Sequence, residues 1–232
     1  HLFVQDEASV KLLQSIGITN TTIVGDTRFD RVLEICRQAK ELPLVELFKG
    51  EHTAFVAGSS WGPDEDIFIP YFNAHPEVKL IIAPHVIEES HLKEIIGKLN
   101  RTVVRYTQAT EEKVKEADCL LIDCFGLLSS IYRYGEIAYI GGGFGVGIHN
   151  VLEAAVYGMP VIFGPNNKRF REAQGLLQCK GGFEIQGEED FKKIMDEFLT
   201  NYEALDKAGK KAGNYVRDNA GALEKIMHTV TL

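Results

Sequence analysis

The sequence predicts an α/β protein built on a doubly wound, mostly parallel Rossmann-like sheet. Short apolar runs rich in β-branched residues alternate with helical patterns along nearly the whole chain. This alternation is typical of right-handed strand–helix–strand crossovers in a parallel sheet. The apolar runs are nearly continuous, without a polar residue at every second position. They therefore indicate strands that helices cover on both faces.

The expected elements follow one another in chain order. Apolar, β-branched runs predict strands at residues 21–24, 53–57, 79–83, 102–105, 119–122, 137–140, 160–163 and 183–185. Helical patterns predict helices at residues 7–15, 28–39, 65–73, 88–99, 127–134, 150–157, 170–177, 189–199 and 202–229. Segment 41–51 is expected to be a connection.

We expect residues 1–232 to form a single Rossmann-like domain that ends in the helix 202–229. The chain opens inside an apolar run at residues 1–4, without an initiator methionine. It is therefore expected to be part of a longer protein, with residues 1–17 as the tail of a preceding domain.

Composition excludes several classes of function. A length of 232 residues, 45% of them hydrophobic and 25% charged, is ordinary for a globular protein. The net charge of −8 argues against non-specific binding to nucleic acid or to an anionic membrane surface. The four cysteines contain no CxxC pair, which favours a reducing compartment and no metal site. Cys119 and Cys124 are expected to be buried core thiols. We find neither a membrane-spanning apolar run nor a signal peptide.

The glycine loop, residues 141–147, is the strongest functional motif. Five of its seven residues are glycine, which lets a ligand approach the backbone closely. The helix expected after it directs free N–H groups and its positive dipole end toward the loop. Glu153, four residues after His149, is expected on the same face of that helix. An anion at the loop and hydroxyls near Glu153 suit a nucleotide. A tight turn without a ligand is the alternative, whereas a dinucleotide GxGxxG motif and a P-loop are absent.

Other polar loops also follow predicted strands and should meet at one edge of the sheet. Gly58, Ser59 and Ser60 could hold a phosphate or carboxylate through N–H and O–H groups, or could merely cap the next helix. His85 and His149 could be plain surface residues, and Asn150 a helix cap. The other loops expected at this edge are residues 123–126 and 164–167. A single site at the carboxyl ends of the strands follows from this convergence.

These motifs resemble those of the 3-deoxy-D-manno-octulosonic acid (Kdo) transferases, which add Kdo to a lipid A precursor in lipopolysaccharide synthesis of Gram-negative bacteria. The resemblance covers essentially the whole chain and matches the C-terminal half of those proteins. It is carried by the segments 3–7, 24–30, 58–60, 81–85, 123–126, 141–143, 149–155 and 160–165.

The resemblance implies the C-terminal half of a GT-B glycosyltransferase that binds the donor CMP-Kdo. It implies an inverting, metal-independent transfer without a cofactor. The implied CMP contacts are Pro84, His85, Phe125, Gly126, Leu127, Asn150, Val151, Leu152 and Glu153, in addition to the loop residues Gly58, Ser59 and Ser60. Arg28 stands where the family has a basic residue that stabilises the transition state, which suits the charge on the departing phosphate.

The resemblance also assigns some functions to the preceding half of the whole protein. These are the general base, the acceptor pocket for the lipid A precursor and the contact with the cytoplasmic face of the inner membrane. The 232 residues alone are then expected to be soluble and to bind nucleotide weakly without catalysis.

The sequence departs from the family at two positions. The usual Pro-Arg-His is Pro84-His85-Val86 here, and a usual glutamate is replaced by Leu127. Both changes alter the nucleotide contacts. Two other functions remain open: a UDP-sugar GT-B transferase or sugar-nucleotide epimerase, and a nucleotide-binding module without transfer chemistry.

Overall fold

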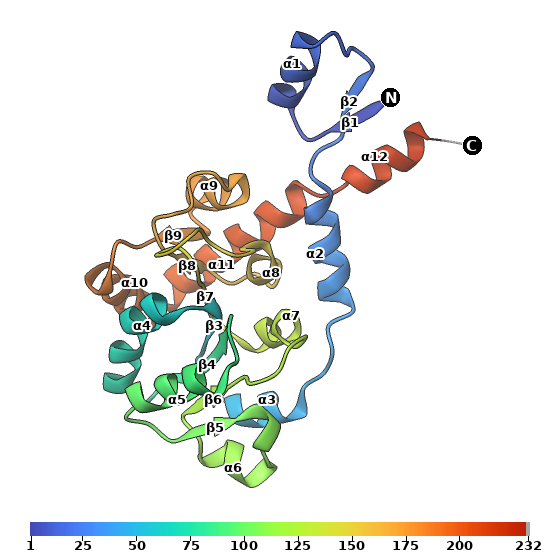
Figure 1. Ribbon diagram of the computed structural model, residues 1–232. Helices are drawn as coiled ribbons and strands as arrows, with labels where there is room; N and C mark the ends of the chain where they lie inside the picture. Colours follow the sequence, from blue (N-terminus) through green and yellow to red (C-terminus); the bar gives the residue numbers. More distant parts are fainter. Residues whose placement is uncertain (231–232) are drawn as a thin grey trace.

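A computed structural model describes residues 1–230. Its centre is a seven-stranded, wholly parallel sheet with the strand order β5-β6-β4-β3-β7-β8-β9 (Figure 1). The strands are β3 (Ala54–Ser60), β4 (Lys79–Pro84), β5 (Val103–Arg105), β6 (Cys119–Leu121), β7 (Ile137–Ile140), β8 (Val161–Phe163) and β9 (Gly182–Glu184). The predicted α/β, doubly wound architecture is confirmed.

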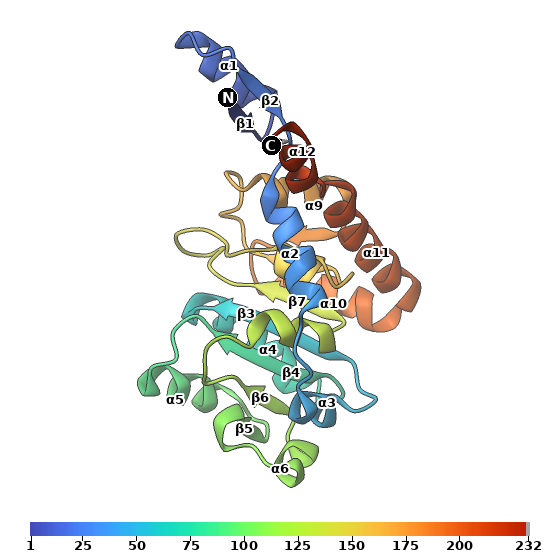
Figure 2. The ribbon, with the colours of Figure 1, turned by 90° about the vertical axis from the view of Figure 1, so that its right-hand side faces the viewer.

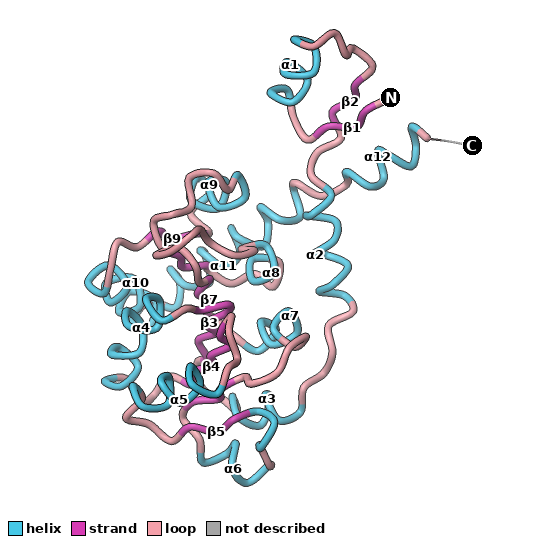
Figure 3. Tube along the Cα trace, in the orientation of Figure 1, coloured by secondary structure: helices cyan, strands magenta, loops and turns pink. Residues whose placement is uncertain are grey.

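Helices cover both faces of this sheet, with α4, α5 and α10 on one face and α2, α3, α7 and α8 on the other (Figures 1 and 3). The helices of the first face are α4 (Gly62–Ala74), α5 (Glu89–Lys98) and α10 (Glu188–Thr200). Those of the second face include α2 (Thr27–Arg37), α3 (Pro43–Lys49), α7 (Leu128–Ile131), α8 (Leu152–Ala155) and α9 (Arg171–Cys179). Two hydrophobic cores result, because successive side chains of each strand point to opposite faces.

Strand β3 shows why the apolar runs are continuous. Ala54, Val56, Phe55 and Ala57 are all fully buried, but Val56 belongs to one core and Phe55 to the other. A strand in the middle of a sheet covered on both faces has no side exposed to water, so alternation with polar residues would bury unpaired polar groups.

The strand order reverses between β3 and β7. After β3, the chain places β4, β6 and β5 on one side of it, and it then returns to place β7, β8 and β9 on the other. In open parallel sheets a crevice forms beyond the carboxyl ends of the strands at such a point. The loops after β3, β4 and β7 are therefore the place to look for a ligand site.

The N-terminal residues form a small unit that projects from the body (Figures 1 and 2). The strands β1 (Leu2–Val4) and β2 (Thr21–Ile23) pair in parallel and flank α1 (Glu7–Ser15). No residue of α1 is buried, and Leu12 is 69% exposed. The central sheet does not include these two strands.

Two expectations about elements were wrong, and one helix was missed. Segment 41–51 contains the helix α3, which has Pro43 in its first turn. The missed helix is α6 (Glu111–Glu116). The single helix expected over 202–229 is two helices, α11 (Tyr202–Asp218) and α12 (Ala222–Thr229). Gly221 separates them with a positive φ of 103°, a conformation that glycine adopts without strain.

Candidate functional site

A cavity of about 210 Å³ lies at the carboxyl ends of β3, β4 and β6. Three of the five loops predicted to converge line it, whereas the glycine loop and residues 164–167 do not. Its lining includes five of the residues predicted to contact a nucleotide: Ser59, Pro84, His85, Phe125 and Gly126. Ala83, Ile122, Cys124 and Leu128 complete it. The wall is mostly apolar, and the ring of Phe125 is 76% exposed at its rim.

The turn after β3 has an unusual backbone that opens this cavity. Ser59 has a positive φ of 53° and lies at an irregularity in the pairing of β3 with β4. A Cβ atom at Gly58 would overlap the Tyr132 hydroxyl, so only glycine fits there. Ser60 is fully buried and donates to Glu65, so its side chain is committed to the protein.

The glycine loop packs against the loop that follows β8. A Cβ atom at Gly143 would lie about 2.5 Å from the backbone nitrogen of Gly164. Asn166 links the two loops, because its backbone N–H donates to the Gly143 carbonyl at 2.9 Å and its amide to the Gly145 carbonyl at 2.7 Å. The glycines of this loop thus serve close contacts between backbones of the protein.

The helix expected at 150–157 is shorter, because α8 contains only Leu152–Ala155. His149 lies in the preceding loop, so it does not share a helical face with Glu153 as expected. Val151 and Leu152 are fully buried in the core. Asn150 satisfies the helix start, since its Oδ1 accepts from the Leu152 N–H at 3.2 Å.

Glu153 is a half-buried carboxylate on α8. Burial raises its pKa, and a hydrogen bond from the Asn150 amide at 3.0 Å lowers it. This bond uses Oε1; the Oε2 atom has no hydrogen bond to any described residue. Glu153 and Asn150 do not line the 210 Å³ cavity.

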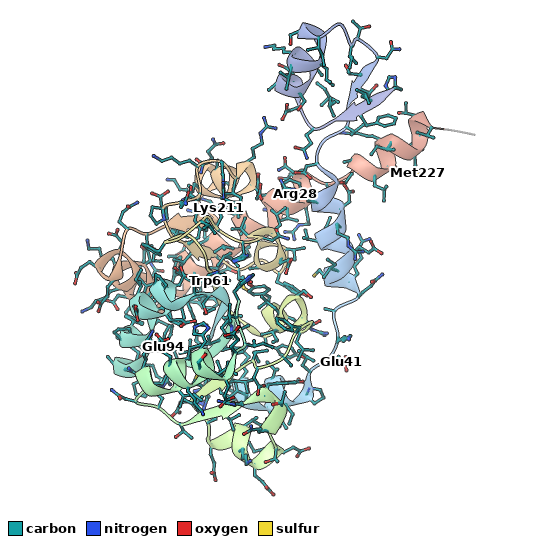
Figure 4. The ribbon with its side chains drawn as sticks, viewed as in Figure 1. Arg28, Glu41, Trp61, Glu94, Lys211 and Met227 are labelled. Carbon is teal, nitrogen blue, oxygen red and sulfur yellow. The ribbon has the colours of Figure 1, made fainter. Side chains whose placement is uncertain are left out.

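Arg28 lies away from this cavity, at the start of α2 (Figure 4). Its guanidinium donates to Asp26, at 2.7 Å from Nη2, and to Glu172 on α9, at 2.8 Å from Nη1. Hydrogen bonds that Arg28 donates to Asp26 and Glu172 raise its pKa, and burial opposes them. Two carboxylates therefore fix the arginine while about half of its side chain stays exposed.

Two acidic residues after β3 have a role that the sequence did not reveal. Asp64 and Glu65 lie in the first turn of α4, and both are buried. Asp64 accepts from Tyr139 at 2.8 Å and from the backbone N–H groups of Trp61 and Gly142, each at 2.9 Å. Burial raises the pKa of Asp64, and these hydrogen bonds lower it. The carboxylate thus ties the glycine loop to the turn after β3.

Three aromatic rings also meet at this edge. Trp61 stacks on His85 with ring centroids 4.6 Å apart, and His149 stacks on His85 at 4.5 Å. The sequence indicated His85 as a contact but gave no sign that Trp61 would join it. Trp61 also lines a second, mostly apolar cavity of about 200 Å³ with Phe144 and Val146.

The cysteine expectation is half confirmed. Cys119 is fully buried in β6, and burial raises the pKa of its thiol to about 12. Cys124 is only half-buried and lines the 210 Å³ cavity. Within residues 1–230, no group of three or more His, Cys, Asp or Glu side chains is arranged to hold a metal ion. No helix in the same range is long and apolar enough to cross a membrane.

Comparison with known proteins finds several Kdo transferases among the relatives of the chain. No protein-family model matches the chain. The Kdo transferase of Aquifex aeolicus (strain VF5) is 30% identical over 86% of this chain and 54% of its own length. That of Rickettsia bellii (strain RML369-C) is 26% identical over 99% of this chain and 56% of its own length. The chain thus spans about half the length of these curated relatives.

The fold agrees with this relationship. The C-terminal CMP-Kdo binding domain of WaaA from Acinetobacter baumannii matches with a TM-score of 0.66 at 19% identity. The match covers 81% of this chain and 99% of that domain. The chain is therefore a homologue of the 3-deoxy-D-manno-octulosonic acid transferases along essentially its whole length, with the Rossmann-like fold of the C-terminal domain of WaaA.

Proposed function

We propose that the chain binds the sugar nucleotide CMP-Kdo and is the donor-binding half of a glycosyltransferase that transfers Kdo to a lipid A precursor. The observation that carries the proposal is the cavity at the carboxyl ends of β3, β4 and β6, in a homologue of Kdo transferases. Its position next to the reversal of strand order is where doubly wound sheets hold nucleotides.

The lining of the cavity suggests how a nucleotide would lie. His85 and Phe125 offer ring surfaces for the base. The backbone at Ser59 and Gly126, both with positive φ, brings main-chain groups to the cavity where a phosphate can approach. The free Oε2 of Glu153 would accept hydrogen bonds from ribose hydroxyls of a nucleotide that extends beyond this cavity.

We propose that Arg28 stabilises charge on the departing phosphate and that the general base belongs to another part of the whole protein. Two carboxylates in the first turn of α4 support the second point. Asp64 and Glu65 are buried and already accept hydrogen bonds from the protein. Neither is free to take a proton from an acceptor hydroxyl. We further propose that the transfer inverts the anomeric centre without a metal ion.

The acceptor and the location of the whole protein are proposed from the same relationship. A lipid A precursor is an amphiphile, so its transferase would work at the cytoplasmic face of the inner membrane. With a net charge of −8, this chain is unsuited to contact anionic lipid directly. Membrane contact would therefore fall to the remainder of the whole protein.

Thermal unfolding of the chain with CMP, CDP, UMP, UDP or NAD tests the donor assignment. A ligand that binds only the folded state raises stability by about 2.7 kcal/mol at a hundredfold excess over its dissociation constant. We expect CMP to raise the unfolding midpoint most and EDTA to leave that shift unchanged. A larger shift with UDP would instead favour a UDP-sugar enzyme.

Variants sharpen this test. Glu153→Ala should abolish most of the CMP shift. Glu136→Ala is a matched control, because Glu136 is also a half-buried glutamate but binds Lys49 and the Ala54 N–H at the opposite edge of the sheet. This variant should lower stability and keep the CMP shift. Equal shifts in both variants would contradict a role for Glu153.

A further inference from the structure

Trp61, His85 and His149 come from three different loops at the carboxyl edge of the sheet. Trp61 follows β3, His85 follows β4, and His149 lies after the glycine loop that follows β7. The planes of Trp61 and His85 differ by 27°, and those of His85 and His149 by 24°. The indole Nε1 of Trp61 lies 3.2 Å from Nε2 of His149.

These distances fix the arrangement of the rings. Two rings stacked on opposite faces of His85 would be too far apart for a hydrogen bond between them. Trp61 and His149 therefore lie edge to edge on the same face of His85. The indole N–H only donates, so Nε2 of the neutral His149 accepts and the proton of that imidazole is on Nδ1.

Backbone contacts hold all three residues in place. The His85 N–H donates to the Ser60 carbonyl at 2.9 Å, and the His149 N–H donates to the Gly141 carbonyl at 3.1 Å. Asp64 accepts from the backbone of Trp61 and of Gly142. The rings are thus connected to one another and to the ends of β3 and β7.

His85 is the most exposed of the three residues. It is exposed and lines the 210 Å³ cavity, whereas Trp61 and His149 are half-buried beneath it. One face of the imidazole rests on the other two rings, so its other face is available to a flat ligand. Stacking on a base is an attractive interaction for any π-face.

We propose that Trp61 and His149 are positioning residues that hold the ring of His85 for stacking against the base of the bound nucleotide. The proposal rests on the function proposed above and identifies which residues prepare the site for the base. A histidine on a free loop would lose rotamer freedom on binding, and the two supporting rings remove that cost in advance.

Calorimetric titration of CMP into the wild-type chain and three variants tests this. His149→Ala removes one supporting ring and the partner of Trp61. His149→Gln retains an acceptor for the indole N–H, and His75→Ala is the control. His75 stacks on Tyr71 at 3.9 Å, remote from the cavity. We expect about tenfold weaker CMP binding in His149→Ala, a smaller loss in His149→Gln, which keeps the hydrogen bond but not the ring, and near wild-type binding in His75→Ala.

A second ligand distinguishes a specific loss of base stacking from a general disruption of the binding site. Ribose 5-phosphate lacks the base, so its affinity should change less than twofold in His149→Ala. Trp61 is the only tryptophan in the sequence, so its fluorescence should respond to CMP in the wild type and not in His85→Ala.

The outcomes distinguish this inference from the proposed function. If the wild type binds CMP and a folded His149→Ala variant binds it with the same affinity, only the positioning role is overturned. An equal loss of affinity for ribose 5-phosphate also overturns it. Absence of CMP binding to the wild type overturns both proposals.

Discussion

At the scale of single residues, His149 gives the site a pH dependence that can be measured. Burial lowers the pKa of His149 below its ordinary value of 6.5, His85 lowers it further, and Asp64 opposes them. The groups that face it are His85 after β4, Asp64 on α4 and the neutral Trp61. Arg169 also reaches the glycine loop, where it donates to the Val146 carbonyl.

Protonated His149 cannot accept the hydrogen bond from Trp61. We therefore expect the fluorescence of Trp61 to change as the pH falls below about 6.5. Because the pKa of His149 is lower in the folded state, the unfolded chain binds this proton first as the pH falls. The free energy of unfolding therefore decreases below about pH 6.5, and the contribution of His149 is fully present only above that pH. A fluorescence titration from pH 8 to pH 4.5 measures the change. The transition should disappear in His149→Gln; if it persists there, another group causes it.

Single residues also explain why the sequence revealed only part of the site. Ser59 could be predicted because small and polar residues directly after apolar strands meet at one sheet edge, whereas His85, Phe125 and Gly126 were expected as contacts through the family resemblance. The burial of Asp64 could not be predicted, because it depends on segments that are distant in the sequence. The three donors to Asp64 come from its own turn, from β7 and from the glycine loop. No local sequence pattern indicates that these three donors contact one carboxylate.

At the scale of elements, the glycines of the glycine loop are not equivalent, because a Cβ atom would overlap other atoms at Gly141, Gly142, Gly143 and Gly147 but not at Gly145. Gly142 has a positive φ of 91°, and a Cβ atom there would overlap the Gly147 carbonyl and lie 3.2 Å from the His149 ring. Gly145 has no such constraint, because a Cβ atom there would lie 3.7 Å from the Gly142 carbonyl. Two glycines of one loop are therefore under different demands.

We expect Gly142→Ala to lower the free energy of unfolding by about 2 kcal/mol or more, because it adds a left-handed conformation for an L-residue to a steric overlap. It should also displace His149 and change the fluorescence of Trp61. Gly145→Ala should change stability by less than about 1 kcal/mol. Urea unfolding followed by circular dichroism measures both. Similar losses in the two variants would show that the loop as a whole, and not Gly142, is constrained.

The end of the chain shows where element prediction from sequence fails. Apolar spacing continues through 202–229, but α11 and α12 are separate helices. The free N–H groups at the start of α12 are satisfied by Asp30 on α2, which accepts from Gly221 at 2.8 Å and from Ala222 at 3.1 Å. This cap is 191 residues away in sequence. Capping residues are recognised from sequence only when they are local.

At the scale of the whole molecule, the sheet order explains why the fold was easier to predict than the site. Parallel strands with short crossovers force every interesting loop to one edge, whatever the side chains do. The convergence of loops, the fold class and the strands were therefore accessible from the sequence. The separation of Arg28 from the cavity was not, because it depends on the path of α2 and α9 outside the sheet.

The whole chain should also differ in stability from one part to another. Amides of β3, β4 and β7 are in the centre of a seven-stranded sheet between two cores. The unit formed by β1, α1 and β2 has a two-stranded sheet of its own, and its apolar Leu12 and Ile16 are 69% and 68% exposed. Regions with few buried apolar contacts open at a lower free-energy cost than the core.

Hydrogen–deuterium exchange of the chain should therefore proceed in two stages. We expect peptides within residues 2–23 to exchange at least tenfold faster than peptides from β3, β4 and β7, because a local opening that costs 1.4 kcal/mol less is ten times more populated. Saturating CMP should slow exchange at the loops around the cavity and leave residues 2–23 unchanged. Equal protection of the N-terminal unit and β3 would mean that the chain unfolds as one cooperative body. In that case the exposed surface of α1 would be no guide to its stability.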